Sequence, residues 1–167
     1  MCVNSLEIRV TTLSPAEWGR WRDLRLDSLV SDAHAFGSVY EVEAAWSDED
    51  WVNKVAQFVP VVATSDSADI AMMSVENLSG DFGATCWIGG CWVRPNYRKL
   101  GVLRSMLDFI DEHAVARDWT VQGLGVWHDN LPAIAAYERL NFEQRGEPVP
   151  SSRQPGKFYQ RMIRTTP

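Results

Sequence analysis

The residues best suited to chemistry in this chain lie in VRPNYRKLGVLRSM, residues 93–106. Four cationic side chains surround Gly101 there, namely Arg94, Arg98, Lys99 and Arg104. The first amides of a helix have no partner within the helix and carry partial positive charge, and a glycine lets the backbone come close to a ligand. Such a turn suits a pyrophosphate. A basic surface turn ahead of an amphipathic helix explains the same residues, and this stretch alone leaves both readings open.

A second stretch with chemical potential follows at LGVWHDNLPAIAAYERLNF, residues 124–142. Asn130 can cap a helix that begins with Leu131 and Pro132, and Tyr137 carries a phenol. The common nucleotide motifs GxxxxGK[ST] and, after the first strand, GxGxxG are missing from the chain. A nucleotide-triphosphate or dinucleotide site of the usual kind is therefore not indicated.

Together these two stretches resemble the GNAT superfamily of N-acetyltransferases. In that family's phosphate motif, Arg/Gln-x-x-Gly-x-Gly/Ala, Arg98 and Gly101 match, while Leu103 stands where a small residue is usual. The family's next motif is matched without a gap by Leu124, Val126, Asn130, Ala133, Tyr137 and Phe142. The resemblance is close over residues 84–142, and residues 25–43 resemble the N-terminal helical segment of bacterial members.

The resemblance implies that the basic turn holds the pyrophosphate of acetyl-CoA. The donor-binding positions in the turn are then Arg98, Lys99, Leu100, Gly101, Val102 and Leu103. The family's sheet splays apart, so that backbone groups around Cys91, Trp92 and Val93 pair with the pantetheine arm. Asn130 corresponds to a donor-contacting amide, although a plain helix N-cap explains it equally well.

For acetyl transfer the resemblance makes Tyr137 the general acid that protonates the departing thiolate. Taken alone, Tyr137 reads as a half-buried core aromatic. Many family members have a glutamate on the strand before the turn, but TCWIGGCWV, residues 85–93, has no carboxylate. Glu76 is the tentative base. His128, a water relay and capture of an already neutral amine are the alternatives.

The expected function is transfer of an acetyl group from acetyl-CoA to a primary amine of a small molecule or peptide. Direct transfer is favoured because Cys86 and Cys91 have no evident histidine partner for an acyl-enzyme. A catalytically silent CoA-binding sensor or scaffold is the rival, and a longer acyl group or a hydroxyl acceptor also fits the motif. Acceptor specificity is expected from the N-terminal helices, the loop with Phe36 and Tyr40, and a hairpin around residues 146–158. Five carboxylates between Glu41 and Asp50 either attract a cation or form a solvated helix start.

Composition limits the classes of partner and ligand that this chain is expected to have. A net charge of −6 argues against binding to a nucleic-acid backbone, and the longest uncharged stretch is too short to cross a bilayer. The three cysteines, Cys2, Cys86 and Cys91, have neither metal-ligand nor disulfide spacing, so no metal is expected. A cytoplasmic protein follows, and the choice between monomer and homodimer stays open.

Periodicity indicates the elements that position these residues. Strands are expected at 6–11, 58–64, 70–78, 84–93, 120–127 and 158–163, the second to fourth as an antiparallel meander. Helices are expected after the capping boxes at Ser14 and Ser47, from Val102, and from Asn130 to about Leu140, while residues 32–46 read as a loop or broken helix. This order predicts an α/β (α+β) fold in one domain, residues 1–167, with a mixed, mostly antiparallel sheet flanked by helices, as in the GNAT family.

Overall fold

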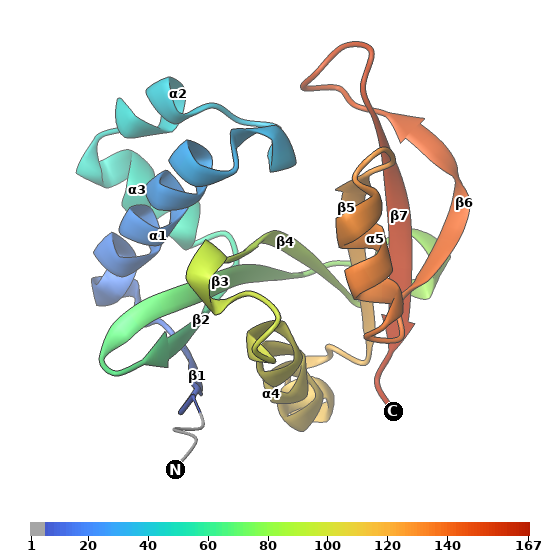
Figure 1. Ribbon diagram of the computed structural model, residues 1–167, viewed down its shortest axis with the longest axis horizontal. Coiled ribbons are helices and arrows are strands. Elements are labelled where there is room, and N and C mark those ends of the chain that lie inside the picture. The colour runs from blue at the N-terminus through green and yellow to red at the C-terminus, as the bar shows by residue number, and fades with distance from the viewer. Residues whose placement is uncertain (1–5) are drawn as a thin grey trace.

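One seven-stranded sheet runs through the computed structural model, which describes residues 6–167 (Figure 1). The strands lie in the order β1-β2-β3-β4-β5-β7-β6. Neighbours are antiparallel except β4 and β5, which run parallel. This confirms the predicted mixed sheet and its meander. The strands are β1 Arg9–Thr12, β2 Val59–Ser65, β3 Ala68–Asn77, β4 Cys86–Val93, β5 Val121–Trp127, β6 Glu143–Pro150 and β7 Phe158–Thr165.

Helices cover both faces of the sheet. Alternate residues of a strand point to opposite faces, so Val61 and Met73 pack with α4, whereas Val62 and Met72 pack with α1 and α3. Burial on both faces explains why the sequence of β2 is almost continuously apolar. The helices are α1 Trp18–Ser31, α2 Tyr40–Ala44, α3 Asp48–Val55, α4 Val102–Arg117 and α5 Leu131–Glu138, with 3₁₀ turns η1 Pro15–Glu17, η2 Ala33–Ala35, η3 Asp81–Gly83 and η4 Pro95–Tyr97.

The helix boundaries follow the expected capping signals. Ser47 Oγ accepts a hydrogen bond from the Asp50 amide at 3.2 Å, and the Asp50 carboxylate accepts one from the Ser47 amide at 2.9 Å. Asn130 Oδ1 accepts a bond from the Ala133 amide at 3.4 Å. Asn141, just beyond α5, has a left-handed backbone with φ of 69°, as asparagine often does after the end of a helix. These local signals fix where α3 and α5 stand relative to the sheet.

One strand differs from expectation, and the segment expected as a loop or broken helix is a broken helix. Strand β6 was not predicted, because EQRGEPVP is mostly exposed, ends in proline and lacks apolar alternation. Residues 40–44, inside the expected loop or broken helix, form the short helix α2. Between residues 6 and 167 no helix is both long and apolar enough to span a bilayer, and the cytoplasmic location stays a prediction. Cys2 lies outside the described residues.

Candidate functional site

The sheet opens between β4 and β5. The two strands pair only where Cys86–Ile88 lie beside Gln122–Leu124. Just beyond this point β4 carries a bulge, in which Gly90 and Cys91 together face Met73 of β3, and Gly90 takes a left-handed backbone with φ of 54°. Bulges bend a strand and redirect its side chains. The bulge therefore marks the place where β4 leaves β5.

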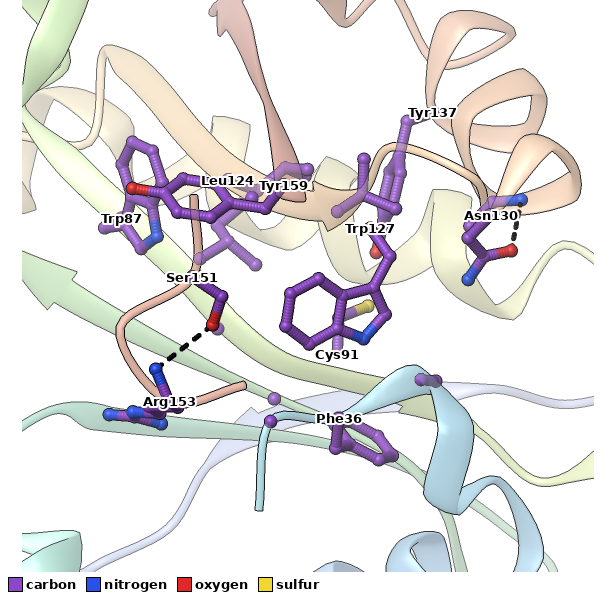
Figure 2. Close-up of a pocket in the computed structure, with 18 of the residues that line it drawn as sticks. Phe36, Trp87, Cys91, Leu124, Trp127, Asn130, Tyr137, Ser151, Arg153 and Tyr159 are labelled. Carbon is purple, nitrogen blue, oxygen red and sulfur yellow. Dashed lines mark hydrogen bonds between the residues drawn. The ribbon is translucent and has the colours of Figure 1, made fainter. Parts of the chain in front are cut away.

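A cavity of about 410 Å³ fills this opening (Figure 2). Its walls come from β4 around the bulge, the carboxyl end of β5, α5, and two loops near residues 35–37 and 151–153, with one residue each from α1 and β7. The lining residues used below are Arg25, Phe36, Gly37, Trp87, Cys91, Trp127, Asn130, Tyr137, Ser151, Arg153 and Tyr159. The wall thus includes several aromatic rings and several of the residues picked out by sequence.

Tyr137 points from α5 into this cavity toward Cys91 on β4 (Figure 2). Burial, followed by the adjacent Cys91, raises the pKa of the Tyr137 phenol well above its usual value near 10.0. Burial also raises the pKa of the Cys91 thiol to about 11, although hydrogen bonding from Tyr137 lowers it. Both groups are therefore neutral at pH 7, and the phenol keeps a proton that it can donate.

The basic turn has the form of an anion site. Gly101 precedes α4 with φ of 85°, and a Cβ there would meet nothing within 4 Å. Within the described chain, the amides of residues 99–104 donate no hydrogen bond to another residue. The whole row of amides is free to face a ligand at the start of a 16-residue helix.

Arg98 is engaged elsewhere in this structure. Its Nη2 donates to Asp32 Oδ2 at 2.6 Å, and its Nε donates to the Val93 carbonyl at 2.9 Å. Trp92 Nε1 donates to the same Asp32 oxygen at 2.7 Å. Burial raises the pKa of Asp32, but bonds from Arg98, Trp92 and Ser31 outweigh it and lower that pKa to about 2. Arg98 thus ties the turn to the end of α1.

Of the predicted donor residues, Cys91 and Asn130 line the cavity, whereas Trp92, Val93 and residues 98–103 do not. The Cys91–Val93 backbone has no pairing with β5, and the Val93 carbonyl is bound by Arg98. Asn130 both caps α5 and lines the cavity, so its two sequence readings coexist. Leu103 is half-buried and packs on the core, which accounts for a large residue at this position. In the turn itself, Lys99 and Leu100 are exposed, and Val102 is buried.

The candidate bases lie outside the cavity. Glu76 is exposed on β3, beside Trp87 of β4, and is not among the residues that line the cavity. His128 is exposed, with Nδ1 3.3 Å from the Phe158 carbonyl. None of the lining residues is an aspartate or glutamate. A proton leaving an amine in this cavity would need water to reach either candidate.

Several wall residues were not singled out by sequence. Trp127, Tyr159 and Arg153 line the cavity, as does Arg25 of α1. The Phe36 loop and the hairpin around residues 146–158 were expected to shape the acceptor side, and both reach the wall, whereas Tyr40 does not line it. Trp127 follows Val126 of the second motif, which is the one signal that could have marked it. In residues 6–167 no group of three His, Cys, Asp or Glu side chains could hold a metal ion.

The chain resembles known acetyltransferases in sequence pattern and in fold. Residues 19–142 match the family model described as the acetyltransferase (GNAT) family. No curated protein matches the chain in sequence. Similar solved structures include a GNAT-family acetyltransferase from Streptococcus pneumoniae, with 15% identity, TM-score 0.73, and coverage of 96% of this chain and 100% of that one.

Two further solved structures have a similar fold. The ribosomal-protein-S18-alanine N-acetyltransferase from Escherichia coli shares 16% identity at TM-score 0.65, over 96% of this chain and 94% of that one. Arabidopsis thaliana Naa50, in complex with the bisubstrate analogue CoA-Ac-MVNAL, shares 14% identity at TM-score 0.68, over 95% and 98% of the two chains. At these identities the likenesses establish a common fold.

Proposed function

Because the chain belongs to the GNAT acetyltransferase family, we propose that it transfers an acetyl group from acetyl-CoA to a primary amine. The observation that carries this proposal is that two features lie at the carboxyl end of β4, the turn that follows the strand and the cavity that Cys91 lines. Free amides of residues 99–104 stand at the start of α4, and Tyr137 with its retained proton stands inside the cavity. One site suits a pyrophosphate, and the other suits a departing thiolate.

The proposed donor site runs from the turn to the cavity. The amides of residues 99–104 hold the pyrophosphate, and Arg98 contributes through its bonds to Asp32 and Val93, which hold the turn in place. The pantetheine arm lies along the open edge of β4 around Cys91 and Trp92, with Asn130 at the other side of the opening. The described chain of residues 6–167 acts as one transferase domain, with acetyl-CoA as donor and no metal.

In the proposed reaction the amine nitrogen bonds to the thioester carbonyl carbon, and the carbon–sulfur bond then breaks. The sulfur takes the phenolic proton of Tyr137, and the amine proton leaves through water. Glu76 receives that proton only over such a relay, since it does not line the cavity. An amine with a pKa near 10.4 is neutral in about one molecule in 10³ at pH 7, so removal of this proton matters to the rate.

The raised pKa values of Cys86 and Cys91 favour direct transfer over an acyl-enzyme. Burial raises the pKa of Cys86 to about 12, with a further contribution from Asp118, and the pKa of Cys91 is about 11. At pH 7 only about one Cys91 in 10⁴ is a thiolate, which is the nucleophilic form. An acyl-enzyme on either residue is correspondingly disfavoured.

The absence of a carboxylate on the cavity wall favours one rival, a CoA-binding sensor without turnover. Calorimetric titration with acetyl-CoA, followed by release of CoA thiol with a panel of amines, separates the two. Binding with amine-dependent release supports the transferase. Binding without release from any amine supports the sensor.

A matched pair of variants tests the donor site. Gly101→Ala and Gly101→Glu pay the same backbone penalty for a left-handed residue, about 1 kcal/mol, and neither Cβ meets a neighbour. Only the glutamate places a negative charge beside the amides. We expect Gly101→Glu to bind acetyl-CoA at least about tenfold more weakly than Gly101→Ala. Equal affinities would remove the turn from the donor site.

A further inference from the structure

The acceptor side of the cavity lacks the groups that recognise a polycation. Its walls there are the rings of Phe36, Trp87, Trp127 and Tyr159, and no lining residue is acidic. The acidic run from Glu41 to Asp50 does not reach the cavity. An acceptor with several ammonium groups would find no counter-charge on this wall.

Of the two cations on the wall, one is already neutralised. Arg25 donates from Nε and Nη2 to both carboxylate oxygens of Glu43, each at 2.8 Å, and its guanidinium stacks 4.7 Å above the Phe36 ring. Arg153 forms no ion pair with any residue between 6 and 167. Arg153 is therefore a lining cation without a counter-charge among the described residues, whereas nearby Lys157 stacks on the Trp127 ring and does not line the cavity.

Two loops meet over this part of the cavity. Gln154 Nε2, in the loop between β6 and β7, donates to the Phe36 carbonyl at 3.1 Å. Arg153 packs against the neighbouring Gly37, where an added Cβ would lie 3.5 Å from Arg153 Cδ. Ser151 Oγ accepts bonds from the Arg153 and Gln154 amides, which keeps the loop in this shape. Figure 1 shows this loop reaching from β7 toward the segment after α1.

The bridge between the loops limits the size of the acceptor. About 410 Å³ must hold the acetylated end of the donor as well as the amine. The hydrogen bond between Gln154 and the Phe36 carbonyl crosses part of this side, so a polypeptide has less room here than a small molecule. A small molecule fits without breaking this contact.

We infer that the acceptor is a free α-amino acid with an apolar or aromatic side chain, its carboxylate held by Arg153. This inference rests on the transferase function proposed above. The amine points toward Cys91 and Tyr137, and the side chain lies against Trp127 and Tyr159. Among residues 6–167 the buried Trp127 Nε1 has no acceptor, which leaves a donor on this wall for a polar group of the substrate.

Three probes test the inference: L-phenylalanine, its carboxamide, and a tripeptide that begins with phenylalanine. We expect the parent protein to prefer the free amino acid, measured as kcat/KM from release of CoA thiol. Arg153→Gln should lower kcat/KM for phenylalanine roughly 10-fold or more, as expected for a hydrogen bond to a charged group, and leave the carboxamide unchanged. For each probe, kcat/KM of the variant is compared with kcat/KM of the parent. The different basicities of the three amines therefore do not affect the comparison.

Arg9→Gln is the matched control, because it removes the same charge from an exposed position on β1, at the far edge of the sheet. It should leave all three probes unchanged. Turnover of the carboxamide or tripeptide at least equal to that of phenylalanine, with no selective loss in Arg153→Gln, would overturn this inference and leave the transferase standing. Binding of acetyl-CoA with no turnover of any amine would overturn both.

Discussion

At the scale of single residues, the site depends on side chains that are uncharged at pH 7, the Tyr137 phenol and the Cys91 thiol. The Tyr137 phenol is enclosed beside Cys91, and its pKa is raised chiefly by burial. The sequence motif that ends at Phe142 already predicted Tyr137 as a candidate. The Arg98–Asp32 ion pair was not predictable from the sequence, because it joins residues 66 positions apart and has no local pattern.

Tyr137→Phe tests the acid. We expect kcat to fall by about 10²-fold, the lower end of the range for general acid catalysis, because a thiol is a good leaving group. Affinity for acetyl-CoA in calorimetry should not change, since the ring is retained. Equal values of kcat in the two proteins would return Tyr137 to a packing role.

The expected pH dependence of kcat/KM follows from the raised pKa of Tyr137. A raised pKa keeps the phenol protonated as the pH rises, so kcat/KM should increase with deprotonation of the amine and show no falling limb below pH about 10. In Tyr137→Phe the curve should keep its shape at a lower level. Glu76→Gln serves in the same assay, where a lower kcat/KM supports the water relay and an unchanged kcat/KM removes Glu76.

At the scale of elements, one short parallel contact decides where the sheet opens. Trp87 of β4 lies directly beside Gly123 of β5, so its ring covers the glycine and also lines the cavity. The strands themselves were predictable from their apolar residues. Strand β6 was not, because an edge strand that pairs only with β7 needs no apolar face and its residues show none.

Gly123→Ala should disturb both stability and the acceptor wall. A Cβ at this position would lie 2.5 Å and 2.6 Å from two ring atoms of Trp87, so the ring must move. We expect a loss of about 1–3 kcal/mol in the free energy of unfolding, the usual cost of overpacking. We also expect KM for the amine to change more than affinity for acetyl-CoA.

Gly19→Ala is the control for this measurement. Gly19 lies in α1 with nothing within 4 Å of an added Cβ, so alanine should stabilise the helix by about 0.5–1 kcal/mol. Urea unfolding of both variants gives the comparison. A Gly123→Ala protein as stable as the parent, with an unaltered KM, would show that Trp87 has room to move freely.

At the scale of the whole molecule, the sheet separates two helical layers, and Asp32 helps to connect α1 with the turn that leads into α4, as does the ion pair of Asp27 with Arg94. The α1–α3 layer packs on one face and α4 with α5 on the other. Asp32, at the end of α1, binds Trp92 of β4 and Arg98 of the turn that leads into α4. The proposed acceptor wall and donor turn are thereby held in register.

Asp32 should make the free energy of unfolding depend on pH in the acidic range. Its pKa in the folded protein is about 2, below the ordinary 3.8, so its stabilising effect is complete above pH about 4 and disappears as the pH falls toward 2. Asp32→Asn should therefore unfold more easily than the parent by about 1–2 kcal/mol at pH 7, with the difference vanishing near pH 2. Asp108→Asn, at an exposed site on α4, should match the parent throughout. A pH-independent difference for Asp32→Asn would place its effect in packing.

The two indoles on the cavity wall have an optical consequence. Trp87 and Trp127 meet whatever enters the opening of the sheet, whereas Trp51 and Trp119 are fully buried. Tryptophan emission responds to the polarity of its surroundings, so the chain carries an intrinsic fluorescence reporter of ligand entry. Trp87→Phe and Trp127→Phe each remove one of the two indoles, so the pair of variants assigns the fluorescence change to one side of the cavity. The donor and the acceptor can then each be titrated without a label.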